Sequence, residues 1–357
     1  MARIDGTNLA DILNGTSVAD QIFGNGGNDR LAGHGGNDTI RGGSGQDIID
    51  GNAGNDILFA DSNEGGEDVL FGGDDSDILV SGSGRDHFNG GSGGNNVDAA
   101  SWQESAFAVV ANISTGTAAS RGVQDTFTLI ENLIGSRHGD VLTGDEGKNG
   151  LFGGDGDDRL FGQGGSDELS GGAGNDTLDG GAGPVNSLRG GAGVDTVDYF
   201  GVTGLQVDLE EGTVHANDRF ERLAEIEVVK GSNSADQIVG DAFGNQLFGR
   251  AGNDMIDGGE GNDVLSGGDG ADLFDFDAFT PSKFRPATDS GFDRITDFER
   301  AEGDVIDLRS HKEATTFADL RANASQFGTD THLRLGDDTI VVEDVSLSEL
   351  TESMFIF

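Results

Sequence analysis

Apolar residues recur every nine positions along most of this chain, separated by polar stretches rich in Gly, Asn and Asp. The clearest run covers residues 33–50, where two nonapeptides (nonads) follow one another and place Ile40 and Ile49 at position eight. Six Gly-rich residues favour a tight turn, and the three residues centred on position eight favour a short strand whose central side chain points inward. The pattern therefore predicts alternating turns and short strands around a narrow apolar core.

The nonads form three blocks, with ten in residues 6–98, seven in residues 135–198 and five in residues 231–275. Every position-eight residue of the first block is apolar, and most nonads carry Asp at position six. The opening nonad of each block lacks the second pair of glycines, and these nonads begin Gly6-Thr7, Gly135-Ser136 and Gly231-Ser232. Because glycines needed for the tight turn are missing there, we interpret these nonads as entry turns and not as metal sites.

Three irregularities interrupt the blocks. Three extra residues follow the sixth nonad, and we place them as a loop at residues 60–62. The last nonad of the first block puts Asn95 at position six and Val97 at position eight. One further residue is inserted near Pro184.

Two bridges separate the blocks and resemble each other at an offset of 96 residues. Ile130-Glu131 matches Ile226-Glu227, for example. Alternating apolar residues in 109–113 and 205–209 predict strands. Residues 220–229 fit either a strand or a short amphipathic helix, and we favour the strand because the matching segment of the first bridge alternates. The domain prediction reads, in order, first roll 1–98, bridge 99–134, second roll 135–198, bridge 199–230, third roll 231–275 and C-terminal cap 276–357.

Position-six carboxylates should stack along the chain. Two nonads make one coil of 18 residues, so Asp29 should stack on Asp47, and Asp38 on Asp56, about 4.8 Å apart. One cation can bridge two turns at that spacing. Carboxylate and carbonyl oxygens suit Ca²⁺ better than Mg²⁺, and Zn²⁺ normally takes His or Cys. The alternative is that these Asp residues only satisfy their own turns.

Composition supports a bound cation. The chain has 357 residues, with 63 Gly, no Cys and a formal net charge of -44 from 65 acidic and 21 basic residues. Such a charge resists compaction unless it is neutralised, and it disfavours nucleic acid and anionic membrane surfaces as partners. The first residues lack the apolar run of a signal peptide, and no segment approaches the length of a membrane span.

These blocks resemble the RTX (haemolysin-type calcium-binding repeat) family. The resemblance implies an all-β fold, a parallel β-roll solenoid in three blocks with a β-rich C-terminal cap, that binds several Ca²⁺ ions through position-six Asp and turn carbonyls. The implied carboxylate ligands are Asp29, Asp38, Asp47, Asp56, Asp68, Asp77, Asp86, Asp158, Asp167, Asp176, Asp195, Asp254, Asp263 and Asp272. The implied carbonyl ligands include those of Gly24, Gly26, Gly33, Gly35, Gly153 and Asp155. Asn95, Asn149, Asn186 and Asn245 depart from the pattern, and we expect no metal at their turns.

The catalytic motifs in the sequence lack the structural context that they require. Residues 90–94 match G-x-S-x-G, but the nucleophile of that motif needs a strand before it and a helix after it, and Ser92 lies inside a nonad. No H-E-x-x-H sequence is present, and no region of domain size lies outside the repeats. We therefore expect no enzyme in this chain. Trp102 and Tyr199 follow block ends and are expected to pack against the edge of a coil.

The resemblance also implies a role. RTX proteins are typically exported by bacterial type I machinery through an uncleaved C-terminal signal, and residues 355–357 here follow an acidic segment. We expect a secreted, extracellular calcium-binding protein with a structural or interaction role, whose rolls fold as they bind the metal. Two alternatives stay open, a non-catalytic module that accompanies an extracellular protease, lipase or alginate epimerase, and an adhesin for a surface or polysaccharide.

Overall fold

The computed structural model describes residues 1–61, 66–92, 96–217, 219–276, 279–280, 283–284, 291–309 and 311–357. Two compact units divide the chain, Met1–Gly193 and Val194–Phe357. In both units nearly all of the regular structure is β, and most neighbouring strands run parallel. The predicted all-β parallel roll is therefore confirmed.

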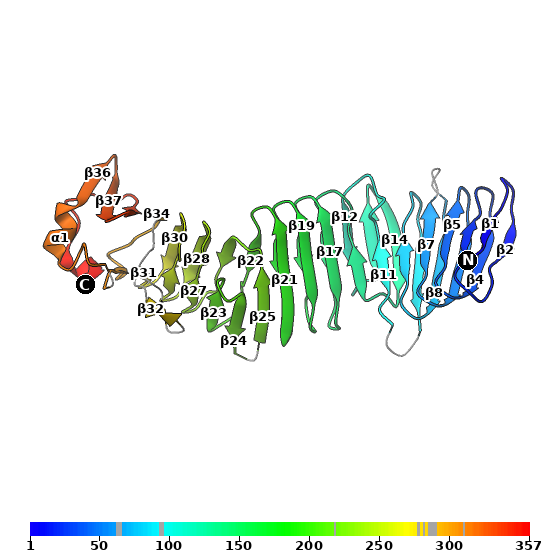
Figure 1. Ribbon diagram of the computed structural model, residues 1–357, viewed down its shortest axis with the longest axis horizontal. Helices are drawn as coiled ribbons and strands as arrows, with labels where there is room; N and C mark the ends of the chain where they lie inside the picture. The colour runs from blue at the N-terminus through cyan, green and yellow to red at the C-terminus, as the bar shows by residue number, and fades with distance from the viewer. Residues whose placement is uncertain are drawn as a thin grey trace. The chain divides into compact units, whose positions relative to one another are not determined.

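The first unit contains two sheets whose strands alternate along the chain. In the order of their pairing, one sheet contains β1 (Arg3–Asp5), β3 (Gln21–Phe23), β5 (Thr39–Gly43), β7 (Ile57–Asp61), β9 (Ile78–Val80), β11 (Ala99–Ser101), β15 (Asn132–Ile134), β17 (Gly150–Asp155), β19 (Glu168–Ala173) and β21 (Val185–Ala192). The other contains β2 (Ile12–Asn14), β4 (Arg30–Gly35), β6 (Ile48–Ala53), β8 (Val69–Asp74), β10 (His87–Gly91), β14 (Val123–Thr128), β13 (Thr117–Ser120), β12 (Val109–Asn112), β16 (Val141–Thr143), β18 (Arg159–Phe161) and β20 (Thr177–Asp179). Figure 1 shows β17, β19 and β21 side by side in this stack.

The register of the strands follows the 18-residue coil. Ile22 pairs with Ile40, and Leu31 pairs with Ile49, so each position-eight side chain stacks on an equivalent one. These side chains are buried, with Ile22, Ile40 and Ile49 at 0% exposure. Burying an aliphatic side chain of this size stabilises the fold by about 1.5–3 kcal/mol, so the column of position-eight residues is the main source of core stability.

The first bridge inserts an antiparallel hairpin into the roll. Strands β12, β13 and β14 pair antiparallel with one another, while β14 lies parallel to β10 and β12 lies parallel to β16. The prediction of strands at residues 109–113 is borne out by β12. These three strands thus continue the sheet from β10 to β16, with β14 next to β10 and β12 next to β16.

The second unit repeats this plan. In the order of their pairing, one sheet contains β22 (Thr196–Asp198), β26 (Val228–Lys230), β28 (Gln246–Ala251), β30 (Val264–Asp269), β34 (Phe292–Ile295), β38 (Asp338–Val342), β37 (Asp330–Leu335) and β36 (Ala324–Phe327). The other contains β25 (Arg219–Ala224), β24 (Thr213–Ala216), β23 (Leu205–Asp208), β27 (Gln237–Val239), β29 (Met255–Asp257), β31 (Leu273–Asp275), β35 (Val305–Asp307) and β39 (Phe355–Ile356). Residues 219–224 and 228–230 are strands, so the helix alternative for this segment is excluded.

The C-terminal segment first adds further strands to the roll and then closes the end of the roll. Strands β34 and β35 pair parallel with β30 and β31, although their sequence has left the nonad pattern. The chain then adds helix α1 (Phe317–Ala322), whose N-cap Thr316 accepts the N–H of Asp319, and the 3-10 helix η1 (Glu352–Met354). A short antiparallel pair, β32 (Phe279–Thr280) and β33 (Lys283–Phe284), precedes them.

Two details of the predicted register are wrong. Ala60 and Asp61 belong to strand β7, with Asp61 paired to Gly43, so they do not form the predicted loop, and Ser62 lies outside the described residues. In the tenth nonad, Ala100 pairs with Leu79 and is fully buried, whereas Val97 is 46% exposed. The buried position-eight residue of this nonad is therefore Ala100 and not the predicted Val97.

Candidate metal sites in the turns

A ladder of hydrogen bonds joins the position-six carboxylates along each side of the rolls. The backbone N–H of Asp29 donates to Oδ1 of Asp47 at 2.8 Å, and that of Asp38 donates to Oδ1 of Asp56 at 2.7 Å. The same contact recurs in the second unit, where the N–H of Asp254 donates to Oδ1 of Asp272 at 2.8 Å. Stacking of these residues one coil apart is therefore as the 18-residue period predicted. Each of these carboxylates therefore uses Oδ1 to accept a backbone N–H from the neighbouring turn.

The second oxygen of these carboxylates is buried. All fourteen predicted Asp ligands are between 0 and 3% exposed. In ten of them Oδ2 is sealed from solvent without a hydrogen-bond donor, namely Asp29, Asp38, Asp47, Asp56, Asp77, Asp158, Asp167, Asp254, Asp263 and Asp272. An ionised carboxylate left this way costs several kcal/mol, and such groups in proteins are normally paired or bound to metal. These oxygens are thus candidate metal ligands on structural grounds.

In seven of these ten residues, Oδ2 lies beside a position-one glycine and a carbonyl oxygen of the next coil. A Cβ built on Gly51 would lie 2.3 Å from Oδ2 of Asp56 and 2.6 Å from the carbonyl oxygen of Gly72. A Cβ on Gly153 would lie 2.1 Å from Oδ2 of Asp158 and 2.6 Å from the oxygen of Gly171. A carboxylate and a carbonyl oxygen therefore line the same small space beside position one. This donor set suits a hard cation such as Ca²⁺.

Burial raises the pKa of these carboxyls far above the usual value for Asp. Desolvation is the main cause, and nearby carboxylates add to it, so that the pKa rises to about 7 for Asp56, Asp158 and Asp254 and to about 8 for Asp263. Asp77 rises to about 7, and Asp47, Asp167 and Asp272 rise to about 6. Near neutral pH these sites need either a proton or a cation.

Sequence comparison decides the family. The description RTX calcium-binding nonapeptide repeat (4 copies) matches residues 5–40, 33–64, 62–97, 134–169, 152–184, 230–265 and 239–274, which cover more than half of the chain. The chain belongs to the RTX calcium-binding nonapeptide repeat family. The matched segments fall in the turns and strands described above, and the family's repeats are calcium-binding.

Two solved structures are similar to parts of this RTX chain. The AlgE6R3 subunit of a mannuronan C5-epimerase from Azotobacter vinelandii is 29% identical, with 36% of this chain and 77% of that chain covered and a TM-score of 0.27. The extracellular lipase LipA from Serratia marcescens is 20% identical, with 63% of this chain and 39% of that chain covered and a TM-score of 0.23. None of the curated proteins compared with the chain matches it. No helix in the described part of the chain is long and apolar enough to cross a membrane.

The RTX entry turns satisfy their carboxylates internally. The N–H and Oγ1 of Thr7 donate to Oδ2 of Asp11 at 2.7 and 2.9 Å. The N–H of Ser232 donates to Oδ2 of Asp236 at 2.6 Å, and its Oγ donates to Oδ1 at 2.7 Å. A hydroxyl therefore stands where other turns present an unpaired oxygen, which agrees with our interpretation that entry turns are not metal sites.

The carboxylate of Asp86 also accepts hydrogen bonds from its own turn, as the carboxylates of the entry turns do. Its Oδ2 accepts the N–H of Gly82 at 3.0 Å and the hydroxyl of Ser81 at 3.4 Å. The sequence signal for the difference is position one of the nonad, where Ser81 replaces Gly. Its side chain enters the space that a glycine leaves open.

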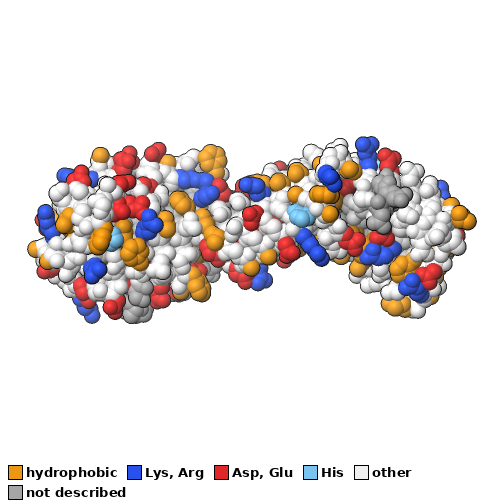
Figure 2. Space-filling model, turned by 90° about the horizontal axis from the view of Figure 1, so that it is seen from above, with side chains coloured by type: hydrophobic (Ala, Val, Ile, Leu, Met, Phe, Trp, Pro, Cys, Tyr) orange, Lys and Arg blue, Asp and Glu red, His pale blue; other side chains and the backbone are white. Residues whose placement is uncertain are grey.

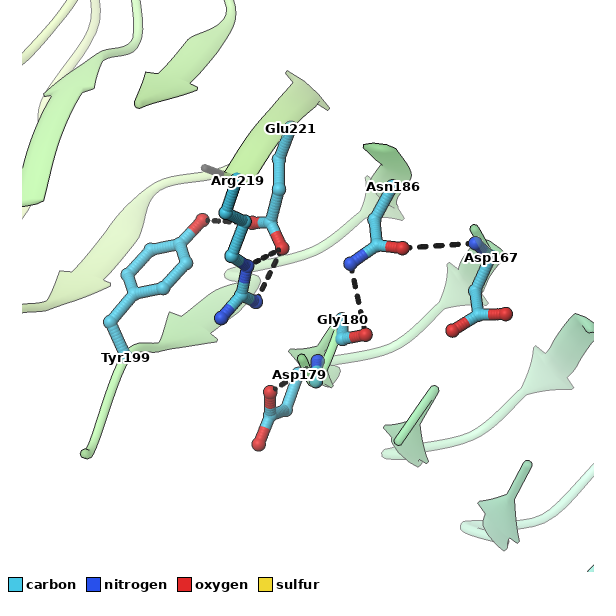
Figure 3. A network of polar contacts seen from close by, with 8 residues as sticks. Asp167, Asp179, Gly180, Asn186, Tyr199, Arg219 and Glu221 are labelled. Atoms are coloured by element: carbon cyan, nitrogen blue, oxygen red, sulfur yellow. Dashed lines mark hydrogen bonds and ion pairs between the residues drawn. The ribbon is translucent and has the colours of Figure 1, made fainter. Parts of the chain in front are cut away.

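Two of the Asn turns place an amide donor where the Asp turns place Oδ2. In Figure 3, Oδ1 of Asn186 accepts the N–H of Asp167 at 2.9 Å, and its Nδ2 donates to the carbonyl of Gly180 at 2.9 Å. Similarly, Nδ2 of Asn149 donates to the carbonyl of Glu131 at 3.0 Å, whereas Nδ2 of Asn245 is buried without a hydrogen-bond partner. In Asn186 and Asn149 the amide keeps the ladder and also donates to a carbonyl. Asn95 lies outside the described residues.

Several residues of the ladder were missed by the sequence reasoning. Asp98 holds position six of the tenth nonad, because its Oδ1 accepts the N–H of Asp77 at 2.8 Å. In the bridges, Oε2 of Glu131 and of Glu227 accept the N–H groups of Asp98 and Asp195, both at 2.8 Å. The recurrence of Ile-Glu at the 96-residue offset was the available signal for these glutamates. In the cap, Asp293 and Asp304 continue the ladder through their Oδ1 atoms at 3.0 Å.

The position-one carbonyls lie beside the turn one coil earlier. The carbonyls of Gly24, Gly33 and Gly153 lie beside Gly6, Gly15 and Gly135. The unpaired oxygens of Asp29 and Asp38 lie beside the carbonyls of Gly42 and Gly51, one coil further along. Of the position-three residues, Gly26 forms a bridge to Ser44, Gly35 ends β4 and Asp155 ends β17.

No three His, Cys, Asp or Glu side chains gather as a metal cluster among the described residues. This follows from the ladder, since each turn contributes one carboxylate to its own space and the remaining donors there are backbone carbonyls. The carboxylates of the turns therefore do not form side-chain clusters.

Proposed function

We propose that this RTX chain is a calcium-dependent folding module that acts outside the cell in a structural or interaction role. The observation that carries the proposal is the row of buried Asp oxygens that face glycine carbonyls of the next coil. Ionised and without a cation, these turns would bury unpaired negative charge. Ca²⁺ would offset that charge, and extracellular calcium modules bind at roughly 10⁻⁴–10⁻³ M.

We assign the calcium ligands from the paired oxygens. Each site would take Oδ2 of a position-six Asp and the carbonyl of the position-one glycine one coil later. The pairs are Asp29 with Gly42, Asp38 with Gly51, Asp56 with Gly72, Asp77 with Gly90, Asp158 with Gly171, Asp167 with Gly180 and Asp254 with Gly267. Asp47, Asp263 and Asp272 offer the same unpaired oxygen. Asp68, Asp176 and Asp195 stay in the predicted set as buried ladder residues, and Asp86 leaves it because Ser81 and Gly82 already occupy its oxygen.

Calcium titration tests the proposal. We expect the far-ultraviolet circular dichroism signal of β structure to grow with millimolar CaCl₂ and to be largely lost in excess chelator, because metal binding and folding are one event. Isothermal titration calorimetry of the same preparation should show saturable uptake of several ions. MgCl₂ at equal concentration is the control and should restore much less structure. An equal β signal with calcium and with chelator would contradict the proposal.

We also propose export through the C-terminal segment, as the family resemblance implies. The last strand, β39, pairs with β35, and Phe355 is buried in the cap. To separate a signal from a folding role, residues 298–357 should be fused to a carrier protein in a bacterium with type I machinery. We expect the fusion in the medium, and the carrier alone inside the cell. Retention of the fusion would overturn the export proposal and leave the calcium proposal intact.

A further inference from the structure

The hairpins of the two bridges bury an acidic residue at the same place. Asp125 pairs with Ala118 in the first hairpin, and Glu221 pairs with Val214 in the second, which is the same register shifted by 96 residues. Asp125 is 5% exposed and Glu221 is 0% exposed. The two hairpins can therefore be compared residue by residue.

Each buried acid accepts a hydrogen bond from an aromatic side chain. Nε1 of Trp102 donates to Oδ2 of Asp125 at 2.8 Å, and the hydroxyl of Tyr199 donates to Oε2 of Glu221 at 2.8 Å. The two aromatic residues are structurally equivalent. Each follows the last strand of a block, and each donates its backbone N–H to the carbonyl of the last residue in the strand paired with that one. Both aromatic side chains were predicted to pack against the coil, and each also makes this polar contact.

The second hairpin adds a cation that the first lacks. Arg219 donates through Nε to Oε1 of Glu221 at 2.8 Å, and its guanidinium carbon lies 5.6 Å from the centre of the Tyr199 ring (Figure 3). In the first hairpin Val123 holds the place of Arg219, as the pairings Ser120–Val123 and Ala216–Arg219 show. The buried acid is conserved between the hairpins, but the guanidinium that neutralises it is not.

A pocket lies where the guanidinium is missing. Its volume is about 390 Å³, and its lining includes Asp125, Trp102, Val123, Glu104 and Phe107. Two arginines lie at the pocket, and the contacts described for them go to residues other than Asp125. Arg41 pairs with Asp61 at 2.6 Å and Glu104 at 3.3 Å, both of which line the pocket, and Arg121, which also lines it, lies over the ring of Phe107 at 4.4 Å.

Asp125 retains capacity for another donor. It accepts three hydrogen bonds, from Trp102 Nε1, from the hydroxyl of Ser81 at 3.0 Å and from the N–H of Asp86 at 2.9 Å. A carboxylate offers about four acceptor positions. The indole of Trp102 adds an electron-rich ring, which favours a cation beside it.

We propose that this pocket binds a small organic cation with a guanidinium group, which takes the place beside Asp125 and Trp102 that Arg219 fills beside Glu221 and Tyr199. The site lies within the first unit and is lined in part by residues 81–84 of the turn that carries Asp86, which we leave out of the calcium set. A free guanidinium compound and an arginine side chain of a peptide present the same chemistry to it.

Tryptophan fluorescence reports on this pocket directly, because Trp102 is the single Trp of the chain. With the full chain folded in calcium, methylguanidinium should cause a saturable change in emission, whereas the neutral methylurea should cause none. A Gly-Arg-Gly peptide distinguishes the sources. Binding of the peptide as tight as that of methylguanidinium identifies an arginine side chain as sufficient, and binding of methylguanidinium alone identifies a free compound.

Val123→Arg should supply the cation from within and weaken methylguanidinium binding by about tenfold or more, as loss of one charged hydrogen bond predicts. Val110→Arg is the matched control, since Val110 is 57% exposed on the same hairpin and does not line the pocket. Unchanged emission in the wild type, or an equal response to methylurea, would overturn the proposal.

The reverse substitution keeps the proposal testable if Val123→Arg does not fold. Arg219→Ala should lower the melting temperature by leaving Glu221 without its guanidinium, and methylguanidinium, but not methylurea, should restore part of the loss. Absence of this rescue, together with no binding to the wild type, would show that the hairpins do not accept a free guanidinium.

Discussion

At the scale of single residues, the residue at position one of the nonad is one determinant of whether the Asp oxygen of a turn stays unpaired. Glycine there leaves a space lined by Oδ2 of the Asp and a carbonyl of the next coil, as at Gly51 and Gly72. Ser81 fills that space with a hydroxyl that donates to Asp86. The difference is one of volume and hydrogen bonding, since a glycine has no Cβ to occupy the site.

Gly51→Ala should therefore disable one site. The added methyl would lie 2.3 Å from Oδ2 of Asp56, so we expect loss of one bound calcium and destabilisation of the calcium-loaded protein by about 2 kcal/mol. Gly35→Ala is the control, because a Cβ there would meet its nearest atom at 3.7 Å. Chemical denaturation in calcium and calorimetric counting of ions measure both effects. Equal behaviour of the two variants would show that the space beside Gly51 holds no ion.

At the scale of elements, the 18-residue coil tolerates substitutes for the metal. An amide at Asn186 donates to the carbonyl of Gly180, and the glutamates of the bridges continue the ladder where the nonads stop. Each block therefore begins or is interrupted by turns that need no cation. Calcium dependence should be concentrated in the uninterrupted Asp turns.

Asn186→Asp should convert a metal-free turn into a calcium turn. The new carboxylate keeps the acceptor for the N–H of Asp167 and places an oxygen opposite the carbonyl of Gly180, so the two oxygens repel unless a cation lies between them. We expect one additional bound calcium by calorimetry and lower stability in chelator. Asn37→Asp, at an exposed turn position, adds the same charge and should change neither quantity. An unchanged ion count in Asn186→Asp would contradict the assignment.

At the scale of the whole molecule, much of the negative charge is turned inward. The formal net charge is -44, and the ladder carboxylates that carry part of it are almost fully buried. On the face drawn in Figure 2, acidic and basic side chains are interspersed among uncharged ones. Their elevated pKa values mean that protons compete with calcium for the folded chain.

The pH dependence without calcium follows from the sign of these shifts. The folded pKa is raised to about 7 for Asp56 and Asp158 and to about 8 for Asp263, against 3.8 ordinarily. The folded state therefore binds protons more tightly than the unfolded state, so stability is lost above the folded pKa and gained as pH falls towards 4. In chelator, β structure measured by circular dichroism should increase between pH 8 and pH 5. Apparent calcium affinity should fall over the same interval. A metal-free chain that gains structure as pH rises would contradict this account.

Much of the fold could be read from the chain because the repeat is local. Apart from Val97 in the tenth nonad, position eight lies in a strand from Ile22 to Phe274, and the alternation in residues 205–209 correctly predicted β23. The insertions could not be placed in this way. Asp98 and Asn95 both fit position six by composition, and only the pairing of Ala100 with Leu79 decides between them.

By itself, the sequence determined the period, the inward-facing apolar column, the family and the kind of metal, since each depends on residues within nine or eighteen positions. The tertiary structure alone decided which oxygens face one another. It paired Asp29 with the carbonyl of Gly42 and placed Asp293 and Asp304 in the ladder. It also left a pocket beside Asp125, whereas Glu221, the equivalent residue of the second hairpin, is paired with Arg219. These contacts join atoms from different coils and hairpins, and their distances follow from how the backbone stacks, which no local pattern of residues encodes.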